Sequence, residues 1–548
     1  MDAPGGPRVR QAPGRPTAAP APPRMGPAAW TALLVGAAAA FLVVIIGTAA
    51  TERRPPVTAS LLPPPPTPPD GRPAPRGLLG AGSCTSSGCH AAPVEGHAAW
   101  QSSFTVWASR DPHARAHAVL REPLAEAIVA ALAVRSPDRA VVPAADNVAC
   151  IGCHATGRGR MAAEGVGCES CHGAAGDWLV SHTLPGWRTA GNTLGMVDLA
   201  DPFVAAGQCA GCHVGGPPAD DGAPREVSHD LIAAGHPRLA FELRGFKEAE
   251  PPHWRDRFAA DRGPSSDAQV GGQTGTQAAA SGGSPAAAGV RLDPVDEWAL
   301  GRLGSLRVFL GQVARQSAAA ERRSAVERKA PDGPLAAVWP EFTAFDCYGC
   351  HRPALVGHAA DPSRDPSRDP TANPGGLGVP RLEPLHWALL DTILPAGATT
   401  LATFRADVER RWWQVPDAAA LAESVRAIDA ARHAGHAPLA ALPAGPLAER
   451  VVRGVAAADW DEAAAGLAAL RAIADRAAAR GAQPAALTPA RERLDRLRGL
   501  LEFPVAAAAS PDSPRAASAT RFDSPHAYDA AAVSAALEAA AAALAPLP

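Results

Sequence analysis

The chain has 548 residues, and hydrophobic side chains make up 47% of them while charged side chains make up 19%. The length is enough for about two to four domains. The formal net charge of −3 at pH 7 is near neutral, which argues against a nucleic acid and against a strongly anionic partner.

The first 77 residues contain no cysteine and divide into three segments. Residues 1–27 are rich in Pro, Gly and Arg, a composition typical of disorder. Residues 28–50 form an uncharged apolar run that is long enough, as a helix, to cross a bilayer. A cleaved signal peptide is the alternative, and we favour an uncleaved membrane anchor. Residues 51–77 are Pro-rich and are predicted to form an extended linker.

Ten cysteines follow, and they form five pairs that are each followed directly by a histidine. The five sites are Cys84, Cys89 and His90; Cys150, Cys153 and His154; Cys168, Cys171 and His172; Cys209, Cys212 and His213; and Cys347, Cys350 and His351. The last four read C-x-x-C-H, the attachment site of a c-type haem. The two thiols form thioether bonds to the haem, and the histidine becomes the proximal iron ligand. The sequence therefore predicts five covalently attached haem c groups.

Other uses of paired cysteines fit less well. A disulfide framework does not require a histidine after every second cysteine. Structural zinc would need tetrahedral ligation by adjacent Cys and His residues, which is awkward, and redox C-x-x-C motifs rarely occur in sets. The first motif has four residues between its cysteines, so its loop must bulge, which its Ser and Gly residues allow.

A six-coordinate haem needs a second axial ligand, and twelve of the seventeen histidines remain after the five proximal ones. The strongest candidates are His113, after Asp-Pro; His182, ten residues after His172; and His229 and His236. The last two are seven residues apart, which would place them on one face of a helix. His97 and His386 are weaker candidates for the remaining haem. Four strong candidates for five haems leave one iron without an identified distal ligand.

The rest of the chain is predicted to be mainly α. Residues 78–260 form a loop-rich body with the first four motifs, residues 261–290 are a low-complexity insertion, residues 291–355 hold a helix and the fifth motif, and residues 356–378 are a second linker. Asp201 and Asp293, each followed by Pro, predict helix starts.

Residues 379–548 contain no cysteine and are predicted to form a helical domain. Asp459 with Glu462 predicts one helix start there, and Thr488 followed by Pro predicts another. We expect this domain to cover the haem body, and a separate partner-binding module is the alternative.

Residues 107–116, 164–173, 229–239 and 339–351 resemble the cytochrome c-552/c-554 family, and the resemblance covers about residues 78–355. It implies a mostly helical, loop-rich fold with closely packed haems, often ligated by two histidines, that passes electrons between redox partners. It also implies that His113, His182, His229 and His236 are distal ligands. The chain differs from the small tetrahaem carrier of that family by its fifth motif, its anchor and its long helical tail.

We therefore expect a membrane-anchored multihaem cytochrome c. Because c-type haem is attached on the export side of a membrane, its haem body should lie in the periplasm or an equivalent exported compartment. Its partners would be redox proteins or a quinone-linked complex. The alternative is an oxidoreductase that acts on a small nitrogen or sulfur compound at one open haem. The chain lacks a C-x-x-C-K motif, which is one marker of a catalytic haem. It also has only two tyrosines, which leaves little material for a tyrosine-modified catalytic haem. Both features favour an electron carrier, and we assign no catalytic residues.

Overall fold

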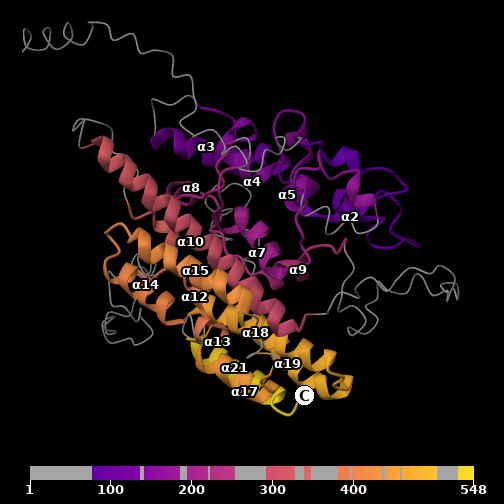
Figure 1. Ribbon diagram of the computed structural model, residues 1–548, viewed down its shortest axis with the longest axis vertical. Coiled ribbons are helices and arrows are strands. Elements are labelled where there is room, and N and C mark those ends of the chain that lie inside the picture. Colours follow the sequence, from indigo (N-terminus) through magenta and orange to yellow (C-terminus); the bar gives the residue numbers. More distant parts are fainter. Residues whose placement is uncertain are drawn as a thin grey trace, which may run out of the picture. The chain divides into compact units, whose positions relative to one another are not determined.

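The computed structural model describes residues 77–135, 141–184, 194–219, 222–253, 292–327, 339–346, 380–394, 398–434, 439, 441–456, 459–502 and 529–548. Within these ranges the chain is mainly helical and has two isolated β-bridges but no strand, which confirms the predicted mainly α class (Figure 1). The predicted segments 1–27, 28–50, 261–290 and 356–378 lie outside the described residues, as does the fifth cysteine motif. None of the helices in the described ranges has the length and apolar character of a membrane span.

The part of the chain with the first four motifs consists of short helices and turns. These are η1 (Ala81–Cys84), α2 (Ser103–Arg110), η2 (Pro112–Arg115), η3 (Ala118–Arg121), α3 (Pro123–Arg135), η4 (Ala144–Asp146), α4 (Val148–His154), η5 (Met161–Glu164), α5 (Cys168–His172), η6 (Ser181–Thr183), α7 (Pro202–Ala210), η7 (Gly211–Gly215), α8 (His229–Ala233) and α9 (Leu243–Ala249). Helices α4 and α5 each end at a proximal histidine, so one helical turn presents both thiols and the imidazole of a motif.

The long helix α10 (Pro294–Glu327) lies between these short helices and the cysteine-free helices that follow (Figure 1). It begins as predicted, with the Asp293 carboxylate accepting the N–H of Val295 at 2.9 Å. Helix α7, which carries Cys209, packs against α10 and is capped by Asp201 as predicted. The position of the fourth motif is therefore set by helix-on-helix packing.

The C-terminal segment is helical. Its elements are α12 (Pro384–Trp387), α13 (Leu390–Ile393), α14 (Ala398–Arg410), α15 (Ala418–Ala434), α17 (Ala444–Arg453), α18 (Trp460–Ala479), α19 (Pro484–Leu501) and α21 (Ala530–Leu544), preceded by η9 (Phe342–Ala344). Buried side chains from these helices and from α7 and α10 form one hydrophobic cluster. The C-terminal helices therefore share a core with the helix that leads into the fourth motif.

One predicted helix start in this segment is confirmed and one is wrong. The Asp459 carboxylate accepts the N–H of Glu462 at 3.0 Å at the start of α18. Helix α19, in contrast, starts at Pro484 and not at Thr488. Pro484 takes the first helical position, where the missing N–H costs no hydrogen bond, whereas Pro489 lies inside the helix and removes one.

Candidate haem sites

Three proximal histidines lie opposite histidines that were predicted as distal ligands. The ring centroids are 6.2 Å apart for His90 and His182, 6.4 Å for His154 and His236, and 6.1 Å for His213 and His113. Two imidazoles on opposite sides of one metal, with metal–nitrogen bonds of about 2.0 to 2.1 Å, should have centroids about 6.3 Å apart. All three pairs therefore have the spacing that an iron between two axial histidines requires.

Hydrogen bonds at Nδ1 also hold most of the rings of these pairs. Nδ1 lies within hydrogen-bond distance of a protein oxygen in five of the six rings: the carbonyls of Trp100 (2.6 Å, His90), Ala116 (2.9 Å, His154), Leu179 (2.5 Å, His182) and Pro237 (2.8 Å, His236), and the carboxylate of Asp111 (3.0 Å, His113). Metal-ligating histidines usually donate their other ring N–H to such an acceptor, which fixes the ring. The arrangement leaves Nε2 available to iron, so the residues fit a haem held by two histidines.

Two carboxylates surround His113. The Asp111 carboxylate accepts hydrogen bonds from the His113 backbone N–H at 2.8 Å and from its ring. The hydrogen bond from the His113 ring to Asp111 raises the pKa of His113. Burial acts to raise the pKa of Asp111, but the hydrogen bonds from His113 outweigh this effect, so the pKa of Asp111 is lowered. Burial and the charge of Asp111 raise the pKa of Glu250, whose carboxyl lies within 4.8 Å of the other two groups. Because His113 faces His213, we interpret the carboxylates as groups that orient and polarise a ligand.

The third motif is different. Burial, together with the charges of His253, His90 and His182, lowers the pKa of His172 to about 4. The ring is therefore neutral at physiological pH, the form in which histidine binds a metal. None of the three paired spacings includes His172, and His253 is the histidine whose charge acts most on its pKa. The distal ligand of this motif therefore has no assignment.

Thiols of different motifs contact one another. Cys84 lies close enough to Cys168, and Cys212 close enough to Cys153, to be the main cause of the raised pKa of each of these thiols. These contacts bring the attachment points of the first and third motifs together, and likewise those of the second and fourth. Burial and the nearby Cys209 raise the pKa of the Cys171 thiol, so the third and fourth motifs adjoin. The Gln208 side-chain amide next to Cys209 also donates to the Ser170 carbonyl at 2.5 Å, which links the third and fourth motifs.

No disulfide joins the eight described cysteines, which are the two cysteines of each of the first four motifs. All eight thiols are thus available for attachment. The sites of Cys347, Cys350 and His351 lie outside the described residues, so the fifth haem site remains a prediction.

The segment from His229 to His236 is not one continuous helix, so the condition for a shared helical face is not met. Helix α8 ends at Ala233, and Gly235 adopts φ of 114°, a conformation that ends the helix and turns the chain before His236. The two histidines therefore do not share a helical face. His236 lies opposite His154. The ring centroid of His229 instead lies 5.5 Å from that of Phe342, which is near the start of the fifth motif in the sequence. The assignment of His229 as a distal ligand remains a prediction.

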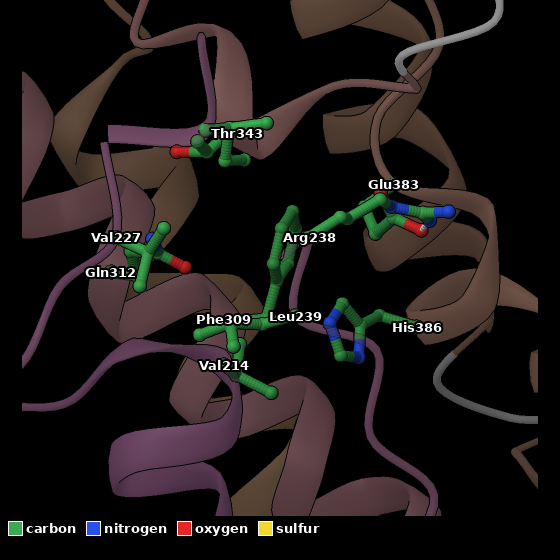
Figure 2. A pocket seen from close by; sticks show the side chains of 10 residues that line it. Val214, Val227, Arg238, Leu239, Phe309, Gln312, Thr343, Glu383 and His386 are labelled. Atoms are coloured by element: carbon green, nitrogen blue, oxygen red, sulfur yellow. Dashed lines mark hydrogen bonds and ion pairs between the residues drawn. The ribbon is translucent and has the colours of Figure 1, made fainter. Parts of the chain in front are cut away.

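His117, His386 and His97 show why sequence alone is a poor guide to which histidines are distal ligands. His117 is buried, with Nε2 at 2.9 Å from the Ala145 carbonyl and Nδ1 at 3.2 Å from Arg121, so both ring nitrogens have protein neighbours. His386 is equally buried, and burial with the charges of Arg302 and Arg238 lowers its pKa to about 3. It lines a cavity in the core (Figure 2). Burial, which separates these two from the exposed His97, cannot be read from local sequence.

Paired imidazoles beside paired thiols fit the binding of c-type haem. Residues 84–173 match the model of the family described as cytochrome c554 and c-prime, and the match spans the first three cysteine motifs. It confirms the predicted resemblance over this segment, which is part of the predicted range 78–355, and supports a haem-based electron-transfer role. No curated protein and no solved structure matches the chain.

Proposed function

We propose that the protein is a membrane-anchored pentahaem c-type cytochrome that transfers electrons between redox partners on the exported side of a membrane. The proposal is carried by the three histidine pairs with centroids 6.1 to 6.4 Å apart. When bound, haem supplies an iron that gains and loses one electron. Two histidines on one iron leave no position for a substrate, which favours electron transfer over catalysis at these three sites.

The residues around the pairs hold the ligands and tune their basicity. Carbonyl acceptors fix four rings, and the charged acceptor Asp111 fixes His113. A charged acceptor makes the imidazole a stronger electron donor, which stabilises the oxidised iron. The fourth site should therefore have a lower potential than it would have with a neutral acceptor.

The spatial order of the motifs supports a continuous path. The thiol contacts link the first motif to the third and the fourth to the second, and Cys171 adjoins Cys209 between them. The first and second motifs are then the ends of the path among the described sites. Cys89 of the first motif is exposed, so partners could exchange electrons there.

The sequence supports a membrane anchor and an exported haem body. Residues 28–50 are long and apolar enough for an anchor, and the Pro-rich residues 51–77 would hold the haem body away from the lipid surface. Attachment of c-type haem takes place on the export side, which favours the periplasm or an equivalent compartment. Redox proteins or a quinone-linked complex would supply and accept the electrons.

One observation favours a second candidate function. The three paired spacings account for the first, second and fourth motifs and leave the third, so an open coordination position is to be sought there. An open haem could act on a small nitrogen or sulfur compound, which would make the protein an oxidoreductase.

Ligand titration of the purified holoprotein separates the two functions. The carrier should have a mainly low-spin spectrum that cyanide and nitric oxide hardly change, because its irons are saturated by protein ligands. A high-spin fraction that binds these ligands, together with turnover of hydroxylamine or nitrite, would instead establish the oxidoreductase. A preparation without covalent haem would refute both functions.

A further inference from the structure

A carboxylate that takes no part in haem attachment is buried inside the third motif. Glu169 lies between Cys168 and Cys171, at a position where the C-x-x-C-H signature requires no particular side chain. It is only 4% exposed, although glutamate is almost never fully buried without partners. A carboxylate in such a place needs strong hydrogen bonds to replace those that it has lost to water.

Backbone N–H groups from two distant segments supply these bonds to Glu169. The N–H of Leu79 lies 3.0 and 3.1 Å from its two carboxylate oxygens, and the N–H of Gly80 donates at 2.7 Å. The N–H of Ala175, just after the third motif, donates at 2.6 Å. Hydrogen bonds to a charged acceptor are roughly twice as strong as those between neutral groups. Glu169 therefore joins the segment before the first motif to the third motif, although Leu79 and Glu169 are 90 residues apart.

A second carboxylate holds the next residue of the same segment. Glu164, in η5 before the third motif, accepts the N–H of Ala81 at 2.8 Å. Ala81 begins η1, which ends at Cys84, the first attachment point. The Cys84 thiol is in turn close enough to Cys168 to be the main cause of its raised pKa. The anchored N–H groups therefore lie about one helical turn along the chain from the place where the first and third motifs meet.

We propose that Glu169 is a positioning residue that fixes the separation of the first and third haems and adds a buried negative charge beside the third. The proposal rests on the electron path described above, because it needs haem at both motifs. The attachment points on either side of Glu169 keep it next to the third haem, and a buried negative charge there stabilises oxidised iron. Loss of the charge should therefore raise the potential of that haem, and loss of the N–H bonds should move the first haem relative to the third.

Glu169→Gln in the full-length protein matured with haem tests the charge. The amide keeps the size of the side chain, but it is neutral and its NH2 group cannot accept a backbone N–H. We expect the redox equilibrium of one haem to shift about tenfold toward the reduced form, which is about 59 mV for one electron. Electron paramagnetic resonance of the oxidised protein should also show a changed magnetic interaction between neighbouring haems. Glu95→Gln removes the same charge from an exposed position after the first motif and should change neither property.

Glu169→Asp tests the position separately and covers the case in which Glu169→Gln does not mature. It keeps the charge but is shorter by one methylene, so it should lose at least one of the three N–H bonds. We expect the haem potentials to stay close to those of the wild type. Hydrogen exchange of the peptide with Leu79 and Gly80, measured by mass spectrometry, should become faster, and the magnetic interaction should change.

Two results would overturn the role of Glu169. One is wild-type potentials and an unchanged magnetic interaction in Glu169→Gln, or an equal shift of potential in Glu95→Gln. The other is unchanged hydrogen exchange in Glu169→Asp. Wild-type protein without haem at the first or the third motif would instead refute the electron path on which the proposal rests.

Discussion

At the scale of single residues, Asp111 shows how one side chain serves both the backbone and a ligand. Its carboxylate caps η2 through the His113 N–H and also accepts the ring of His113, which faces His213. The Pro at position 112 fixes the chain between them, so the carboxylate and the imidazole meet. The negative charge should stabilise the oxidised form of the haem at the fourth site.

Asp111→Asn should raise the potential of one haem. The amide keeps an oxygen acceptor but removes the charge, and a loss of about 1.5 kcal/mol of preference for oxidised iron corresponds to about 60 mV. A redox titration followed at the haem absorption bands measures the shift. Asp146→Asn, which removes the same charge from an exposed position, is the control and should change the potentials far less. Equal shifts in both variants would contradict the role of Asp111.

The sequence predicted which residue types form the sites but not how they pair. His113 and His182 stood out because of their neighbours in the chain, and both lie opposite a proximal histidine. The pairing of His113 with His213 joins residues from distant parts of the sequence, so no local pattern could reveal it. The burial of His386 likewise depends on contacts such as that with Phe309 of α10, which is far from it in the sequence.

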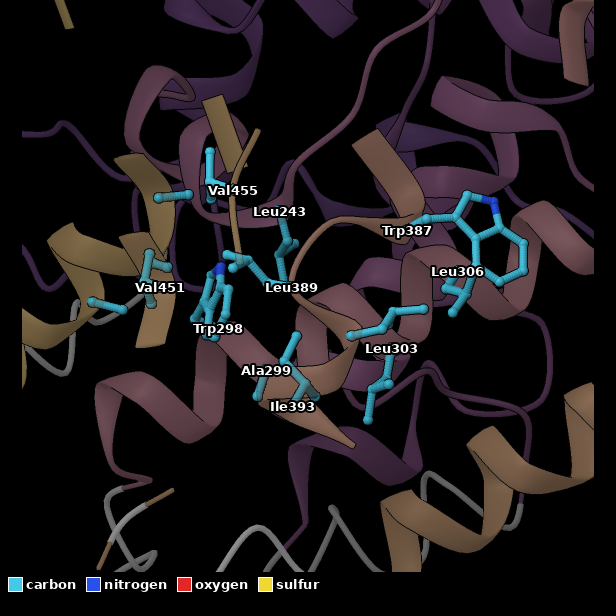
Figure 3. Packing of buried hydrophobic residues seen from close by; sticks show 14 of the residues in the cluster. Leu243, Trp298, Ala299, Leu303, Leu306, Trp387, Leu389, Ile393, Val451 and Val455 are labelled. Carbon is cyan, nitrogen blue, oxygen red and sulfur yellow. The ribbon is translucent and has the colours of Figure 1, made fainter. Parts of the chain in front are cut away.

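At the scale of elements, α10 positions the fourth motif through its contact with α7. The inner face of α10 carries Trp298, Ala299, Leu303 and Leu306, which are buried against side chains from several other elements (Figure 3). Asp293 and Pro294 predicted the start of this helix correctly, because a cap is a local feature. The i, i+7 interpretation of His229 and His236 failed because Gly235 takes a positive φ, which spacing alone does not reveal.

Two glycines of α10 test this contact. A Cβ at Gly304 would lie 2.5 Å from the Phe203 carbonyl oxygen, whereas a Cβ at Gly311 would meet only the end of Arg315 at 3.4 Å. Gly304→Ala should therefore destabilise the fold by about 1 to 3 kcal/mol, because α7 must move. Gly311→Ala should stabilise it by up to about 1 kcal/mol through helix propensity. Urea unfolding of the two variants measures both effects, and equal midpoints would contradict the close packing.

At the scale of the whole molecule, buried ion pairs join the haem body to the cysteine-free helices. The Arg238 guanidinium contacts Glu383 at the start of α12 and lies 2.9 Å from the carboxylate of Asp461 in α18. Burial raises the pKa of both carboxyls, and the charge of Arg238 opposes this effect. Arg238 therefore favours the ionised form of two buried carboxyls where the two parts of the chain meet, against the effect of burial.

Arg238→Met should cost about 3 to 5 kcal/mol at pH 8, because two buried charges lose their partner. Without Arg238 the pKa values of the two carboxyls rise further above their values in the unfolded chain. The ionised carboxylates then lower the free energy of unfolding, and protonation at lower pH restores part of it. The deficit should shrink as the pH falls from 8 to 5, as measured by urea midpoints. Arg307→Met breaks the exposed pair with Asp429 and should cost less than about 1 kcal/mol. A deficit that does not depend on pH would contradict the ion-pair account.

The haem content of the purified protein tests the central claim most directly. A pyridine haemochrome assay, combined with masses of the cysteine-containing peptides, counts the haems and assigns each one to its motif. We predict five covalent haems per chain, one for each of the five cysteine pairs. A count of four would exclude one motif, and the wide spacing of Cys84 and Cys89 makes the first motif the one to inspect. A count of two or fewer would contradict the multihaem account.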